Sequence, residues 1–112
     1  MVKAVKLEGS SMRPLFEEGD IALVSLAPCP EAPPFILAPG DCVVYRHEGR
    51  RLLHRVLAVS GFGPQVSDDA GRIAAHHVAW RNVEGRVISR NRLKKGLVGL
   101  LYSNLKRILS FA

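Results

Sequence analysis

CVVYRHEGRRLLHRVLAVS, residues 42–60, is the stretch that decides the fold class. Its first part, Cys42 to Arg46, is rich in β-branched and aromatic residues, which fit the pleated and half-buried surface of a sheet. Glu48-Gly49-Arg50 is typical of a hairpin turn, and Arg51 to Ser60 returns as a long, apolar-rich strand. The stretch therefore predicts an antiparallel hairpin in the middle of the chain.

Further short strands are predicted on both sides of this hairpin, each bounded by Gly, Pro or Asp turns. They cover residues 2–7, 21–26, 65–67, 72–75 and 83–89. Five prolines between Pro28 and Pro39 forbid regular structure and predict an extended loop over residues 28–40. Many short strands of this kind are typical of a β-sandwich or barrel-like domain, which we place at residues 1–90.

Residues 91–112 change to a helical pattern. Apolar residues recur at the helical steps of three and four, at Leu93, Leu97, Leu100, Leu101, Leu105, Ile108 and Leu109. Asn91 precedes them as the expected N-cap. The pattern predicts a basic amphipathic C-terminal helix. Its apolar stripe either packs on the β domain or, over residues 92–112, makes peripheral contact with an anionic membrane or a partner.

The distribution of charge limits the classes of partner. The 112 residues carry a net charge of +6, with 47% hydrophobic and 23% charged residues, as expected for one globular domain. Six basic residues and no acid follow from Arg90 onward, whereas residues 1–89 carry ten of each sign. A neutral body makes nucleic-acid binding through the basic tail the weaker hypothesis. Because no secretory or membrane-spanning stretch is recognisable, we expect a cytoplasmic or peripheral membrane location.

No cofactor or metal motif is present. Cys29 and Cys42 are too few for a disulfide scaffold and match no metal spacing, so we expect two small, half-buried thiols. His76 and His77 are adjacent, and neighbouring residues on a strand point to opposite faces. At most one of them is therefore expected to face a site.

A candidate nucleophile lies in EGSSMRP, residues 8–14. Pro14 biases the preceding residue away from helix, so we expect a tight turn that leaves a strand and holds Ser11 outward over Met12. A serine hydroxyl needs a neighbouring base, and His54 stands in the apolar run Leu52 to Leu57. His54 is either a hydrogen-bonded core imidazole or a general base that works near neutral pH.

Five blocks in this order resemble one family of serine peptidases. They are GSSMRP (9–14), GDIALV (19–24), GDCVVY (40–45), LLHRVLAV (52–59) and VEGRV (83–87). Together they are similar to the type I signal peptidases and LexA-like peptidases, and most similar to the archaeal and endoplasmic-reticulum signal peptidases, which carry histidine where bacterial enzymes place lysine. The resemblance implies coiled β-sheets with a barrel-like core, and an endopeptidase that cleaves an extended peptide or precursor protein.

The resemblance also implies residue roles. Ser11, directly before Met12, is the expected nucleophile and His54 the expected base. An acid that orients the imidazole is expected at Asp69 first and at Asp68 second.

The oxyanion hole is expected at the same turn. It rests mainly on the backbone N–H of Ser11, with Ser10 as a further contributor, because Gly9 stands where family members often carry a serine.

A catalytically inactive, peptide-binding or maturation-associated module of the same fold is the alternative. Two departures from the family pattern motivate it: residues 72–81 contain no second acid, and only ten residues precede Ser11, where the family has a transmembrane helix.

Overall fold

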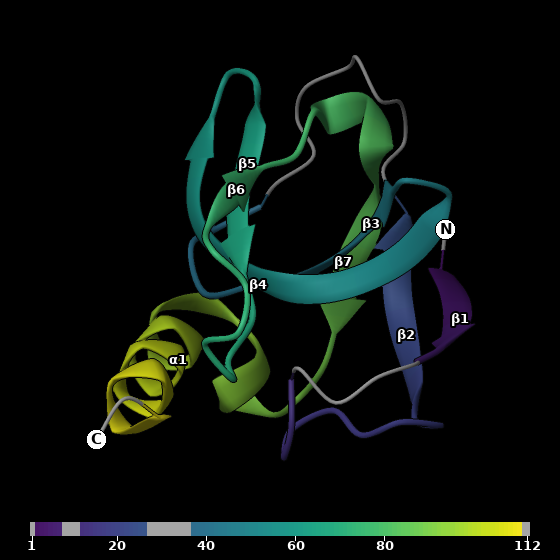
Figure 1. The fold of residues 1–112 in the computed structure, drawn as a ribbon. Coiled ribbons are helices and arrows are strands. Elements are labelled where there is room, and N and C mark those ends of the chain that lie inside the picture. The colour runs from purple at the N-terminus through teal and green to yellow at the C-terminus, as the bar shows by residue number, and fades with distance from the viewer. Residues whose placement is uncertain (1, 8–11, 27–36, 111–112) are drawn as a thin grey trace.

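The computed structural model describes residues 2–7, 12–26 and 37–110. Strands β1 to β7 form one antiparallel sheet in the order β1-β2-β7-β3-β4-β5-β6 (Figure 1). Their bounds are β1 Val2–Lys6, β2 Ile21–Leu26, β3 Cys42–His47, β4 Arg50–Ser60, β5 Gly63–Ser67, β6 His76–His77 and β7 Val83–Ile88. Two short 3-10 helices, η1 Trp80–Asn82 and η2 Arg92–Lys94, and the helix α1, Gly96–Ser110, complete the described part.

The predicted central hairpin is confirmed as β3 and β4. His47 pairs with Arg50, which leaves Glu48 and Gly49 as a two-residue turn. Both turn residues have positive φ, 50° and 77°, as the tightest hairpins require. Val43 lies directly opposite His54 in this register. Tyr45, two residues further along β3, therefore lies on the same face as His54 and diagonal to it.

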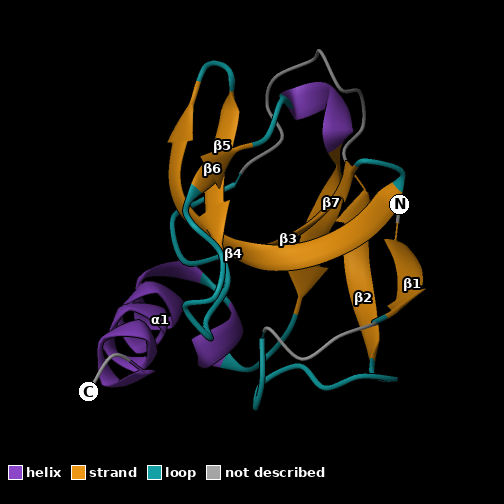
Figure 2. Ribbon diagram, viewed as in Figure 1, coloured by secondary structure: helices purple, strands orange, loops and turns teal. Residues whose placement is uncertain are grey.

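The sheet is open, so the expected barrel-like core is not present as a closed barrel. β1 and β6 stand at its two ends, and β6 has only two residues with which to pair. Curvature comes instead from β4, which arches across the molecule in Figure 2. Its register with β5 shifts between Val56 and Ala58, and such an irregularity bends a strand. The mainly-β prediction is confirmed.

The strand predicted at residues 72–75 is also wrong. The Asp68 carboxylate accepts hydrogen bonds from the backbone N–H groups of Arg72, at 3.0 Å, and Ile73, at 3.1 Å. These donors are thus held in a turn rather than in a ladder, and pairing resumes only at His76 and His77.

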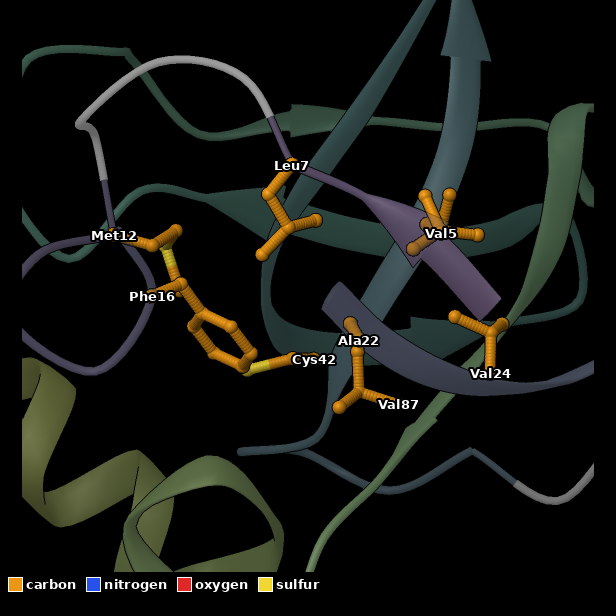
Figure 3. Packing of buried hydrophobic residues seen from close by; sticks show 9 residues of the cluster. Val5, Leu7, Met12, Phe16, Ala22, Val24, Cys42 and Val87 are labelled. Atoms are coloured by element: carbon orange, nitrogen blue, oxygen red, sulfur yellow. The ribbon is translucent and has the colours of Figure 1, made fainter. Parts of the chain in front are cut away.

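Two apolar clusters form the core. Figure 3 shows members of the first, which comprises Val5, Leu7, Met12, Phe16, Ala22, Val24, Cys42, Val44 and Val87. The second comprises Leu37, Val43, Tyr45, Val56, Val66, Val78 and Val83, with Trp80 packed against it. Successive residues of β3 alternate between the clusters, because neighbouring side chains on a strand point to opposite faces. Tyr45 is thereby held in the core.

The predicted C-terminal helix is present and begins at Gly96. Asn91 caps η2 instead, where its Oδ1 accepts the Leu93 N–H at 3.0 Å. The start of α1 is held by Asp41, whose Oδ1 accepts the Gly96 N–H at 2.9 Å. Gly99 lets the helix approach closely, since a Cβ there would lie 2.7 Å from Nη1 of Arg55. Within residues 2–7, 12–26 and 37–110, no helix is long and apolar enough to cross a bilayer.

Candidate active site

The predicted serine turn is only partly described. Gly9, Ser10 and Ser11 lie outside the described residues, as does most of the proline-rich loop. Met12, which directly follows Ser11, is 3% exposed and packs with Phe16 in the first cluster (Figure 3). The chain next to Ser11 is therefore anchored in the core.

Met12 also joins the serine segment to the predicted acidic segment. The backbone N–H of Asp69 donates to Sδ of Met12 at 3.3 Å. The two residues stand far apart in the sequence, and the sheet brings them together. Two of the segments assigned to one site by resemblance thus lie in contact.

His54 is a buried imidazole with a defined partner. It is 3% exposed, and its Nδ1 lies 2.7 Å from Oη of Tyr45. Burial lowers the pKa of His54 to about 4, against a smaller raising effect of the Asp68 carboxylate. The ring is therefore neutral at pH 7, which is the form in which a histidine accepts a proton.

A chain of hydrogen bonds continues from Tyr45. Its Oη lies 3.1 Å from Nε2 of His76, and Nδ1 of His76 lies 3.2 Å from the carbonyl oxygen of Ala74. Burial raises the pKa of Tyr45 to about 12, so its hydroxyl keeps its proton at neutral pH. The chain ends on a carbonyl, which can only accept a hydrogen bond.

When both imidazole rings are neutral, the Ala74 carbonyl fixes which atom donates in each hydrogen bond between Ala74 and His54. Nδ1 of His76 must donate to Ala74, so its Nε2 accepts from the Tyr45 hydroxyl. The Tyr45 oxygen then accepts from Nδ1–H of His54. Nε2 of His54 is left as the nitrogen that carries the lone pair. This is the tautomer that a general base at Nε2 requires.

Asp69 is held by a buried ion pair. Its carboxylate accepts from Nε of Arg55 at 3.2 Å and from Nη2 at 2.7 Å, and both side chains have no exposed surface. Ser103 on α1 donates to the same carboxylate at 2.5 Å. Asp69 therefore ties the helix to β4 through bonds that also occupy its carboxylate oxygens.

Asp68 has the larger electrostatic effect on the histidine. It is fully buried, and of the two carboxylates it is the one that raises the pKa of His54 more. This order is the reverse of the preference expected from the sequence. Tyr45, which the sequence did not single out, is the described partner of Nδ1.

A cavity of about 320 Å³ lies beside His54 and Met12. Its walls include Val5 to Leu7, from β1 and the residue after it, and Arg50 to His54 of β4. β1 is an edge strand, and the β4 residues before Arg55 pair only with β3 among the described strands. Backbone donors and acceptors on both walls are thus available to an added strand.

The remaining candidates are not arranged as a metal centre. His77 is exposed, whereas His76 is half-buried against Tyr45, so one of the pair faces the site. The described segments contain no cluster of three or more His, Cys, Asp or Glu able to hold a metal ion. Cys42 is buried with its pKa raised to about 12 by burial, and Cys29 lies outside the described residues.

Comparisons with protein families, curated proteins and solved structures found no significant match to this chain.

Proposed function

We propose that this chain is a serine endopeptidase of the signal-peptidase type, with Ser11 as nucleophile and His54 as general base. The observation that carries the proposal is the state of His54. It is buried, burial lowers its pKa to about 4, its Nδ1 lies 2.7 Å from Oη of Tyr45, and it lines a cavity together with Met12, the residue after Ser11.

In this mechanism the Ser11 hydroxyl attacks the scissile carbonyl while Nε2 of His54 takes its proton. The imidazolium that forms donates from Nδ1 to Tyr45, and the nearby Asp68 charge favours it. His54 then returns the proton to the leaving amine. The oxyanion is held by the backbone N–H of Ser11, assisted by Ser10.

The substrate is an extended peptide that binds as an added strand. β1 and the first half of β4 on the cavity wall support this mode, because each pairs with only one strand among the described residues. The small residues before the cut are what the family resemblance implies. The curved open sheet is consistent with the coiled β-sheets of that family.

A fluorophosphonate probe tests the nucleophile. We expect an adduct on the peptide that contains Ser11 in the wild-type chain, and none in Ser11→Ala. Ser10→Ala is the matched control and should still be labelled, since the adjacent serine only assists. Failure of the wild-type chain to form any Ser11-dependent adduct, with probe or with lipopeptide inhibitors, would contradict the proposal.

A non-catalytic peptide-binding module is the second candidate. The observation that favours it is the engagement of Asp69, the preferred orienting acid, with Arg55 and Ser103. This alternative predicts that extended peptides bind with equal affinity to the wild-type chain and to Ser11→Ala, without cleavage or labelling of either.

A further inference from the structure

Helix α1 turns its apolar side away from the protein. Gly99 and Ser103 are its buried residues, and they face β4 and the Arg55–Asp69 pair. The large apolar side chains are exposed instead, with 46% to 70% of each accessible, at Leu97, Val98, Leu101, Leu105, Ile108 and Leu109. The sequence left open whether the predicted stripe packs on the β domain; Leu93 and Leu100 of that stripe are half-buried, whereas its other members are exposed.

These six side chains form one continuous face. With 3.6 residues per turn they fall within an arc of about 120°, opposite the buried Gly99 and Ser103. The face runs from Leu97 to Leu109, so it is about 20 Å long at about 1.5 Å per residue. A contiguous exposed apolar surface of this kind marks an interaction site rather than ordinary surface.

The charged residues of α1 and of the segment before it are all basic. Arg90, Arg92 and Lys95 are exposed just before the helix, and Lys106 and Arg107 are half-buried residues of the helix itself. No acidic residue follows Arg90 in the sequence. An exposed apolar helix face with exposed basic residues at one end fits the boundary between headgroups and acyl chains of an anionic bilayer.

We propose that α1 docks the protein on an anionic lipid surface through its Leu97–Leu101–Leu105–Ile108 face. A second copy of this chain fits less well. A two-fold contact through the same face would bring like charges together, with no acid on either helix to compensate. Lipid headgroups neutralise the same cations while the acyl region accepts the apolar side chains.

The docked helix would carry the β domain with it. Arg55 donates to the carbonyl oxygens of Gly40, at 2.8 Å, and Leu93, at 2.7 Å, while Asp69 binds Ser103. These buried bonds make α1 a fixed part of the domain. The candidate active site includes His54, the residue before Arg55, and would thereby be held near the membrane. The lipid proposal itself does not depend on catalysis.

Vesicle sedimentation with the full chain tests it. We expect binding to vesicles of phosphatidylcholine with about a third phosphatidylglycerol, weakened by salt, and far less binding to phosphatidylcholine alone. The double substitution Leu101→Ser/Leu105→Ser should lower the partition coefficient about tenfold or more, because it removes apolar surface that enters the bilayer. Phe62→Ser is the matched control: Phe62 is 86% exposed but distant in the chain, and its loss should change nothing.

Three results would overturn the proposal. The first is no binding of the wild-type chain to either vesicle. The second is undiminished binding by the Leu101→Ser/Leu105→Ser variant. The third is a dimer in light scattering that this variant abolishes, which would make the face a contact between copies. Both substituted leucines are exposed, so circular dichroism should show an unchanged fold.

Discussion

The hydroxyl of Tyr45 lies 2.7 Å from Nδ1 of His54, and the same oxygen lies 3.1 Å from Nε2 of His76. Because the chain ends on the Ala74 carbonyl, neutral rings at both histidines would leave the lone pair of His54 on Nε2. We therefore infer that Tyr45 orients the proposed general base, where an aspartate was expected.

Tyr45→Phe should remove that control while leaving the core packed. We expect ¹⁵N NMR of labelled imidazoles to show the Nδ1–H tautomer of His54 in the wild-type chain and a mixture of tautomers in the variant. Peptidase turnover should fall about tenfold or more with little change in KM. Tyr102→Phe, the other tyrosine of the chain, is the control. An unchanged His54 tautomer in Tyr45→Phe would refute the relay.

The low pKa of His54 predicts the pH dependence of the reaction. Since the imidazole stays neutral down to about pH 4, the acid limb of kcat/KM should lie near pH 4 rather than near the usual value of about 6.5. The measurement is the rate of labelling or cleavage between about pH 3.5 and 8, a range that includes both pKa values. An acid limb at 6.5 would show that the base is not the buried His54.

The same shift predicts how stability depends on pH. Between about pH 4 and 6.5 the unfolded chain binds a proton at His54 that the folded chain does not, so stability is full above this window and falls as pH decreases through it. The slope from this residue is at most about 1.4 kcal/mol per pH unit. The free energy of unfolding, measured by urea titration at several pH values, should fall more steeply with decreasing pH in the wild type than in His54→Gln, by up to this amount. Parallel plots of this free energy against pH would contradict the low pKa of His54.

The buried Arg55–Asp69 pair predicts a large effect on stability. Arg55→Met leaves Asp69 buried without its cation and should cost about 3 to 5 kcal/mol in urea unfolding. Arg55→Met/Asp69→Asn should recover part of that loss, because it removes the stranded charge. Arg13→Ala breaks an exposed pair with Glu17 and should cost less than about 1 kcal/mol. Equal effects at the two sites would contradict the role given to Arg55.

Gly99→Ala tests the close approach of α1. Alanine favours a helix by about 1 kcal/mol over glycine, yet its Cβ would lie 2.7 Å from Arg55 Nη1 and 2.9 Å from the Gly40 oxygen. We therefore expect net destabilisation, measured as a lower midpoint of thermal unfolding. Gly61→Ala, which meets nothing within 4 Å, is the control and should leave the midpoint unchanged. A stabilised Gly99→Ala would show that the helix is loosely docked.

Local pattern was sufficient for most of the fold. β-branched runs and Gly turns place the strands from Val2 to Ser60 within a few residues of their observed bounds. The error at residues 72–75 arose because the Asp68 side chain binds backbone N–H groups that a strand would use. The face of α1 that packs on the β domain was not predictable either, since the helical period identifies an apolar stripe but not whether that stripe is the covered face.

The candidate site was less accessible to sequence reasoning, for a physical reason. His54 stands out as an ionisable residue in an apolar strand, but its link to Tyr45 depends on register, which pairs Val43 with His54 and makes Tyr45 its diagonal neighbour. Arg55, the next residue, is also a charged residue in the apolar strand. Its pairing with Asp69 could not be predicted from sequence, because tertiary packing brings the two side chains together. An orienting role for Asp69 or Asp68 stays a prediction.

A crystal structure of the fluorophosphonate-treated chain would show whether Ser11 and His54 form one site. We expect phosphorus bonded to Oγ of Ser11, Nε2 of His54 within about 3.5 Å of that oxygen, and Tyr45 still on Nδ1. An adduct on another residue, or a Ser11 adduct with the His54 ring on the far side of the sheet, would contradict the proposed mechanism.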